Sequence, residues 1–358
     1  MALQEYKCPS CGGAIEFDSN IQKMKCPYCD TEFEMDAIRE LEEEISREQP
    51  DDMTWDTSGG ETWQEGDAPD MAVYVCRSCG GEIIGNQSTG ATSCPFCGNP
   101  VVILGKFTGD LRPDFVIPFK LDKKAAKEGL LKHFKGKRLL PKVFKTENHI
   151  DEVKGMYVPF WLYDTDAEAH IRYRATRIRK WSDTRFDYTE ISHFSVIRDG
   201  TLGFDKVPVD GSSKLANDLL ESLEPYNYND VIPFQSGFLA GYLADRYDVS
   251  AEESAPRANE RVKQSTEDAI RNTVTGYATV TPEQSNIRLQ GGKVSYALLP
   301  VWILQTSWRG ENYLFAMNGQ TGRFVGNLPV DRVAFWKWWG LLTAIFSVAA
   351  YLGLWILM

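Results

Sequence analysis

The feature that most constrains this chain is a cysteine pattern that occurs twice near its start. Each copy reads C-x2-C-x14-C-x2-C, so two CxxC pairs are separated by 14 residues. The first copy contains Cys8, Cys11, Cys26 and Cys29, and the second contains Cys76, Cys79, Cys94 and Cys97. A CxxC turn can present two thiolates to one ion, and two such turns complete a tetrahedral shell of four sulfurs. The pattern therefore predicts two metal sites, each within a small ribbon of strands.

Four thiolate ligands leave no open coordination position, which favours a structural Zn²⁺ ion in each ribbon. A ribbon of about 30 residues buries almost no core, and zinc binding supplies roughly 10–16 kcal/mol of apparent folding free energy. Iron of the rubredoxin type would use similar cysteine pairs and stays open as an alternative. Thiolates must also remain reduced to bind metal, so the pattern predicts a reducing compartment.

The charge of the chain is unevenly distributed. The whole sequence has 39 basic and 50 acidic residues, but residues 1–110 contain only 7 basic residues against 21 acidic ones. Binding to nucleic acid depends on cationic side chains that neutralise phosphates, and the loops between the CxxC pairs carry few of them. We therefore expect the ribbons to dock proteins rather than nucleic acid.

The other end of the sequence is strongly apolar. Residues Trp338–Met358 are 21 in number and include no charged side chain. A helix of that length is roughly 31 Å long, which matches the hydrocarbon core of a bilayer. Arg332 and Lys337 precede the segment, and flanking cations favour the cytoplasmic side. We expect a single-pass, tail-anchored protein of the cell membrane with the bulk of the chain in the cytoplasm, whereas a buried globular helix is the alternative.

The residues between the ribbons predict a short helix and then an acidic linker. Ile38, Leu41 and Ile45 recur at helical spacing. Residues 49–70 then carry seven acids and no base, which is typical of a disordered segment. Three interpretations of Trp55 and Trp63 in this segment stay open: they anchor a partner, they fold back onto the chain, or they have no specific role.

An internal repeat organises the region after the ribbons. VIPF at 116–119 recurs at 231–234, and YVPFWLY at 157–163 resembles LLPVWIL at 298–304. Each VIPF precedes a stretch with helical character, at 122–134 and at 236–247, and alternating strand patterns follow. These features predict a duplicated antiparallel α+β domain, with two sheets that each pack against helices.

The fold class is therefore α+β, with two N-terminal four-cysteine zinc ribbons, the duplicated domain and one C-terminal transmembrane helix. The predicted order is a first ribbon at 1–35, a helix and disordered linker at 36–71, a second ribbon at 72–103, a duplicated domain at 104–332 (halves about 112–225 and 226–332) and the anchor at 333–358.

We find no sequence motif for catalysis or for a small-molecule substrate, so we do not expect an enzyme. The sequence lacks GxxxxGK[ST], GxSxG, HExxH and GxGxxG. Residues 120–145 hold ten bases against two acids. Three interpretations of this stretch stay open: it is a solvated helix face, it contacts anionic lipid headgroups, or it contacts the acidic linker. A membrane-tethered nucleic-acid-binding protein that uses residues 120–145 is the alternative function.

The tandem CPxCGG…CPxC ribbons, the VIPF and VPFWLY boxes, the WSDTRFDYTEISHFSVIRDG stretch and the final MNGQTGRFVG-to-membrane segment resemble one bacterial family. These are membrane-anchored proteins known as TFIIB-type zinc-ribbon proteins. The resemblance implies a scaffold in envelope-stress response that helps to place a phage-shock protein A-like coat at the membrane. Cytosolic and membrane proteins are the expected partners, and membrane lipid is contacted through Trp338–Met358.

Overall fold

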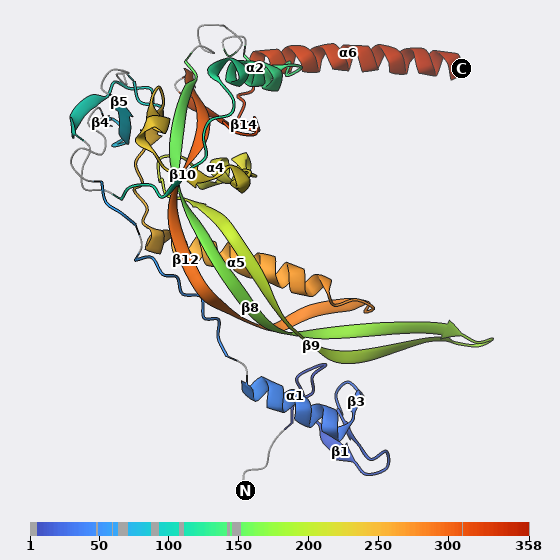
Figure 1. Ribbon diagram of the computed structural model, residues 1–358. Coiled ribbons are helices and arrows are strands. Elements are labelled where there is room, and N and C mark those ends of the chain that lie inside the picture. The colour runs from blue at the N-terminus through green and yellow to red at the C-terminus, as the bar shows by residue number, and fades with distance from the viewer. Residues whose placement is uncertain are drawn as a thin grey trace. The chain divides into compact units, whose positions relative to one another are not determined.

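Figure 1 shows a computed structural model of the chain. It describes residues 6–47, 49–58, 60–63, 71–86, 93–106, 111–141, 144, 152–309 and 311–357. Residues 64–70 of the predicted linker and residues 142, 143 and 145 of the basic stretch lie outside these ranges. The chain forms two compact units. Unit 1 contains Met1–Asp56, Asp164–Asp205 and Arg257–Lys293, and unit 2 contains Thr57–Tyr163, Lys206–Pro256 and Val294–Met358.

Unit 1 starts with the first ribbon, a three-stranded antiparallel sheet followed by a helix. The strands are β1 (Glu16–Asp18), β2 (Lys23–Lys25) and β3 (Glu32–Phe33), and the helix is α1 (Met35–Arg47). The helix predicted after the ribbon is present. It places Ile38 in a small core with Ile15, Met24 and two of the cysteines. So few apolar side chains give this ribbon little stability of its own.

The rest of unit 1 is built from parts of long strands and one helix. They are β8 (Lys154–Ser182), β9 (Asp187–Asp210), β12 (Thr279–Trp308) and α5 (Ala251–Asn272). β8 and β9 pair. α5 buries Ala258, Val262 and Ile270 at helical spacing. A β-carbon at Gly200 of β9 would lie 2.7 Å from Ile270, so the strand and the helix pack closely.

The acidic segment after α1 is not disordered at residues 50–56, in contrast to the prediction. Asp52 and Asp56 form parallel bridges with Arg288 and Lys293 of β12. The indole Nε1 of Trp55 donates a hydrogen bond to Oδ1 of Asn259 at 2.6 Å. The backbone bridges pair polar groups of the main chain, and the side-chain contacts add to them. Together they order a segment that has few apolar residues of its own.

Unit 2 includes the second ribbon, which is continuous with a larger sheet. Its strands are β4 (Met71–Val75), β5 (Glu82–Asn86) and β6 (Val102–Lys106). β5 also pairs with β11 (Leu243–Asp245), which in turn pairs in parallel with β8. The first ribbon, by contrast, has a sheet of its own.

The remaining elements of unit 2 complete this sheet and cover it. They are β7 (Phe115–Val116), β10 (Ile232–Pro233), β13 (Glu311–Asn318), β14 (Phe324–Gly326), α2 (Lys123–Phe134) and α4 (Asn217–Leu223). One path of strands runs β10-β7-β12-β8-β11-β5-β4-β6. The pairs β7–β12 and β8–β11 are parallel, so the sheet is mixed rather than antiparallel. β13 and β14 pair in antiparallel as a hairpin.

The stretch predicted to be helical at 236–247 is not an α-helix. It contains a short 3-10 turn (Ser236–Leu239) and then β11. Gly241, at φ 84°, turns the chain between them. Tyr242 then stacks on Phe119 with ring centroids 4.1 Å apart, a tertiary contact that draws the chain into the sheet.

The repeated boxes make matching local contacts. The carbonyl oxygen of Pro159 accepts the N–H of Gly211 at 2.9 Å, and that of Pro300 accepts the N–H of Gly319 at 2.8 Å. Trp161 donates to the backbone oxygen of Val249, and the matching Trp302 donates to that of Leu121. Both copies lie in one connected sheet, so duplication of a whole domain stays a hypothesis.

Helix α6 (Arg332–Leu357) ends the described chain. The Asp331 carboxylate accepts the backbone N–H of Val333 at 2.9 Å and caps the helix. Over Arg332–Leu352 its mean hydropathy is 1.4, and none of that segment is buried. Within the described ranges, α6 is the one helix long and apolar enough to cross a membrane.

Candidate metal centres

All eight predicted cysteines lie in two groups of four. Within each group the sulfur atoms lie within 4.8 Å of one another. The first group is Cys8, Cys11, Cys26 and Cys29, and the second is Cys76, Cys79, Cys94 and Cys97. The two groups are those that the spacing of the cysteines predicts.

The distances between sulfurs fit a tetrahedral zinc ion. Zn–S bonds of about 2.3 Å in a tetrahedron separate the sulfurs by about 3.8 Å. Sγ of Cys8 lies 3.6 Å from Sγ of Cys29, and Sγ of Cys11 lies 3.5 Å from Sγ of Cys26. In the second group, the corresponding distances are 3.5 Å for Cys76–Cys97 and 3.7 Å for Cys79–Cys94. The donor set therefore fits Zn²⁺ in both ribbons.

One backbone turn recurs at all four cysteine pairs. The N–H of the first cysteine donates to the carbonyl five residues later, and its own carbonyl accepts the N–H of the residue four later, at 2.7–3.0 Å. That fourth residue has positive φ in every copy. These residues are Gly12, Asp30, Gly80 and Gly98. Glycine suits the conformation, and aspartate is among the residues that tolerate it best.

A second relationship holds each ribbon's two turns together. A β-carbon at Gly13 would lie 2.5 Å from the Tyr28 ring, and one at Gly81 would lie 2.9 Å from the Phe96 ring. The aromatic residue of each CPYC or CPFC turn therefore covers the glycine that ends the other turn. The glycines and the aromatic residues occupy matching positions in the two ribbons, but no local pattern in the sequence indicates that they contact one another.

Burial differs within each site. The first cysteine of every turn is buried, whereas the second is more accessible. Cys11 and Cys29 of the first ribbon are exposed, and Cys79 and Cys97 of the second are half-buried. The Thr31 hydroxyl lies 3.2 Å from Cys29 Sγ, and hydrogen bonds from Thr31 lower the pKa of that thiol to about 6. The first site is therefore the more accessible to solutes.

A lysine supports the second site. The Lys154 ammonium donates a hydrogen bond to the backbone oxygen of Ser93 at 2.8 Å and also bonds the Ser93 hydroxyl. Burial lowers the pKa of Lys154, while the charge of the neighbouring Cys94 thiolate opposes that shift. A zinc ion with four thiolates has a net charge of −2, which a nearby cation offsets. No local pattern indicates a role for Lys154 at this site, because it lies 60 positions after Cys94.

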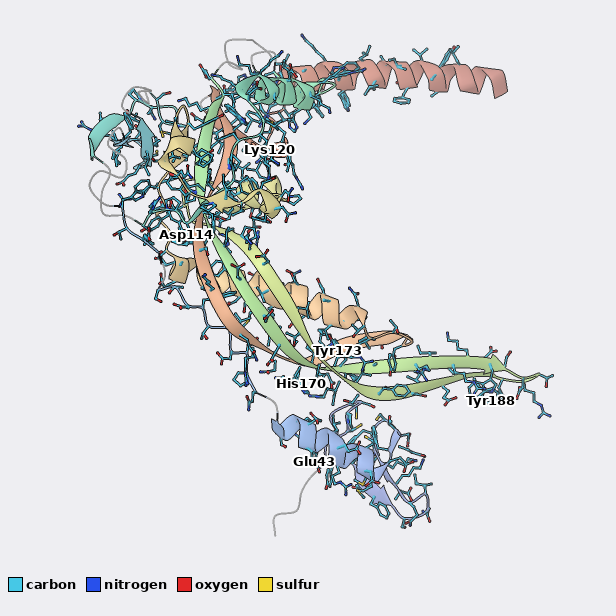
Figure 2. All side chains as sticks on the ribbon, viewed as in Figure 1. Glu43, Asp114, Lys120, His170, Tyr173 and Tyr188 are labelled. Atoms are coloured by element: carbon cyan, nitrogen blue, oxygen red, sulfur yellow. The ribbon has the colours of Figure 1, made fainter. Side chains whose placement is uncertain are left out.

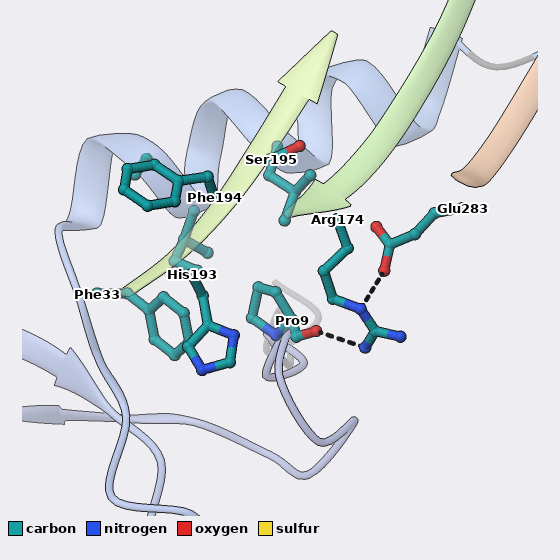
Figure 3. Close-up of a pocket in the computed structure, with 10 residues that line it drawn as sticks. Pro9, Phe33, Arg174, His193, Phe194, Ser195 and Glu283 are labelled. Atoms are coloured by element: carbon teal, nitrogen blue, oxygen red, sulfur yellow. Dashed lines mark hydrogen bonds and ion pairs between the residues drawn. The ribbon is translucent and has the colours of Figure 1, made fainter. Parts of the chain in front are cut away.

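A small apolar cavity of about 110 Å³ adjoins the first ribbon within unit 1. Figure 3 shows Arg174 between Glu283, whose carboxylate lies 3.4 Å from Nε, and the carbonyl oxygen of Pro9. The lining residues are Pro9, Phe33, Ala37, Ile38, Leu41, Arg174, His193, Phe194, Ser195 and Glu283. Pro9 belongs to the first CxxC turn, so the cavity is partly formed by the metal-binding ribbon itself.

The three histidines that the structure describes are not members of the two thiol groups. His170 Nδ1 lies 2.5 Å from an Asp199 carboxylate oxygen, whereas His193 lines the cavity. His133 lies 3.1 Å from the Lys137 ammonium. His149 lies outside the described residues.

Comparison with known proteins places the chain among its relatives. No family model and no solved structure matches it. The Bacillus subtilis (strain 168) protein that bears the name "Uncharacterized protein YdjG" is 34% identical over 314 residues, which cover 74% of this chain and 92% of that protein. Similarity of this extent spans nearly all of the relative, and the chain belongs to the YdjG family.

Proposed function

We propose that this protein is a membrane-anchored adaptor whose zinc-filled ribbons recruit other proteins to the membrane surface. The main support for this proposal is that one chain combines two groups of four cysteines with the apolar helix α6. Four sulfur ligands leave no place for substrate, so the metal stabilises a folded surface. α6 then holds that surface beside lipid, and no catalytic step is part of this function.

The cavity beside the first ribbon supports protein docking. Its lining is mostly hydrocarbon, with Arg174 and Glu283 at one side, a composition that suits an apolar side chain of a partner. The ribbons also lie in the acidic part of the sequence, which disfavours polyphosphate partners. We place the ribbons in the cytoplasm, because Arg332 and Lys337 lie in the first two turns of α6, before its uncharged run, and because reduced thiols suit that compartment.

An adaptor of this kind needs a protein partner in the cytoplasm. We propose a cytosolic coat protein of the phage-shock protein A type, acting in envelope stress, as the resemblance implies. Membrane proteins that bind beside α6 would complete such a scaffold.

In-cell crosslinking of the full-length chain tests the adaptor function. Cys26→Ser with Cys29→Ser removes the first metal site and should abolish crosslinks to cytosolic partners, while the chain stays in the carbonate-resistant membrane fraction. Partners that remain crosslinked without this site would rule out the first ribbon as the docking surface.

A second pair of variants leaves the zinc ligands intact. Ser195→Trp should fill the cavity and remove the same crosslinks, whereas Thr201→Trp, at another exposed position of β9, should retain them. Equal loss in both variants would assign the effect to β9 as a whole rather than to the cavity.

A further inference from the structure

Helix α2 and the turn after it form a strongly basic surface on unit 2. Residues 123–138 contain seven lysines or arginines against one acid, Glu128. We define the α2 basic surface by these seven residues. They are Lys123, Lys124, Lys127, Lys132, Lys135, Lys137 and Arg138.

The geometry of α2 turns this charge outward. Ala126, Leu130 and Phe134 are buried on its inner face, in a core with Phe315 and Met317. The side chains of Lys124, Lys132 and Lys135 are exposed. Because the apolar face fixes the helix against the core, the lysines cannot all turn inward, and their charges stay in solvent.

The α2 basic surface is joined directly to the start of α6. The guanidinium carbon of Arg138 lies 4.6 Å from the ring centroid of Trp338. The backbone N–H of Asp331 donates to the carbonyl oxygen of Leu139 at 2.8 Å. Figure 1 shows α2 beside the first turns of α6, both within unit 2. Trp336 and Trp339, on the same turns of α6, are exposed, as aromatic side chains at a membrane interface are.

We propose that the α2 basic surface binds the headgroups of anionic phospholipids, an inference that rests on the membrane attachment proposed above. Insertion of α6 would bring the residues around Trp338 to headgroup level, and the contacts of Arg138 and Leu139 would hold the lysines of α2 next to that level. Each base near an anionic surface strengthens binding by about fivefold. The α2 basic surface would thus enrich anionic lipid around α6 and set the orientation of unit 2 relative to the membrane.

Not every lysine of this region is suited to a test. Lys120, labelled in Figure 2, pairs with Asp230 at 2.5 Å. Lys137 contacts His133. The triple variant Lys124→Gln, Lys132→Gln and Lys135→Gln avoids both contacts, and glutamine preserves helix propensity.

The control removes the same charge elsewhere. Arg179→Gln, Lys180→Gln and Arg185→Gln neutralise three exposed bases at the end of the β8–β9 hairpin, where Figure 2 labels Tyr188. Both triple variants change the net charge equally, so a difference between them reports position and not total charge.

The full-length chain is equilibrated with detergent micelles that contain equal amounts of phosphatidylglycerol and phosphatidylcholine, and the retained lipids are then quantified by mass spectrometry. The inference predicts at least about fivefold enrichment of phosphatidylglycerol for the parent chain. The α2 triple variant should lose most of this enrichment, and the hairpin variant should retain it. High salt should lower the enrichment, because screening weakens exposed charge contacts.

Three results would overturn the inference without affecting the membrane anchor. They are equal retention of the two lipids by the parent chain, unchanged enrichment in the α2 variant, and loss of enrichment in the hairpin variant instead. Retention of neither lipid would contradict the anchor itself, and the inference with it. If the parent chain shows no lipid preference but binds labelled single-stranded DNA through the α2 lysines, the surface belongs to nucleic acid.

Discussion

The ring of Tyr28 occupies the space that a side chain on Gly13 would need, since a β-carbon there would lie 2.5 Å from Cδ2 of the ring. Gly13 follows the first CxxC turn, and Tyr28 lies inside the second. The same relationship joins Gly81 to Phe96 in the other ribbon. In each ribbon, the aromatic ring of the second CxxC turn therefore packs against the glycine that follows the first turn.

This contact makes Gly13→Ala a test of ribbon packing. The added methyl group should push the Tyr28 ring aside and cost about 1 kcal/mol, or about fivefold in zinc affinity. Adding Tyr28→Ala should restore the affinity, because that ring is 75% exposed and contributes little burial of its own. Competition with a zinc-binding dye measures both variants.

Gly12→Ala is the matched control for that pair. Gly12 has φ 77° and nothing within 4 Å of an added β-carbon. Its substitution should weaken zinc binding through backbone strain of about 1–2 kcal/mol, and Tyr28→Ala should not rescue it. Equal rescue of both glycine variants would contradict the packing explanation.

The two sites should release metal at different rates. Cys11 and Cys29 are exposed, whereas Cys79 and Cys97 are half-buried, and the Lys154 ammonium binds Ser93 and interacts electrostatically with Cys94 beside it. We expect a chelator to remove zinc from the first ribbon at least about tenfold faster. Stopped-flow absorbance with a chromogenic chelator should show two phases.

Variants that each lack one of the two metal sites assign the two kinetic phases. Cys26→Ser with Cys29→Ser should abolish the fast phase, and Cys94→Ser with Cys97→Ser the slow one. Lys154→Met should accelerate the slow phase alone. A slow phase that belongs to the first ribbon would contradict the role given to burial.

Asp245 predicts a pH dependence of stability. Its side chain is 1% exposed, and burial raises its pKa to about 8. The ordinary value is about 3.9, so between about pH 4 and pH 8 the unfolded chain loses this proton before the folded chain does. The folded state then binds more protons, and this group costs increasing stability as the pH rises.

Asp245→Asn removes that cost. The variant should match the parent near pH 4 and exceed it by at least about 2 kcal/mol near pH 8. Urea unfolding in detergent, followed by tryptophan fluorescence at both pH values, measures the difference. A constant difference at the two pH values would show that Asp245 does not titrate in this range.

The sequence predicts the thiol groups well, because cysteine spacing fixes which sulfurs can share one ion. α1, α2 and α5 are also predictable, since their apolar residues recur at helical spacing. The apolar run that ends at residue 358 indicates α6 by length and composition alone.

Contacts between distant residues decide the parts that the sequence does not predict. Asp51 pairs with Lys263 and Trp55 with Asn259, each more than 200 positions away, and these contacts order a segment whose composition is typical of disorder. The boxes that suggested two antiparallel sheets instead join one mixed sheet, because β7 pairs in parallel with β12 from the other copy. Local patterns do not encode such pairings.

We propose above that α6 attaches to the membrane a chain that binds two zinc ions. The most direct measurement is the zinc-to-protein ratio of full-length chain extracted from the carbonate-washed membrane fraction, by elemental mass spectrometry. We expect two zinc ions per chain, one for each four-cysteine group. Chain found in the soluble fraction, or membrane-bound chain that contains iron or no metal, would contradict it.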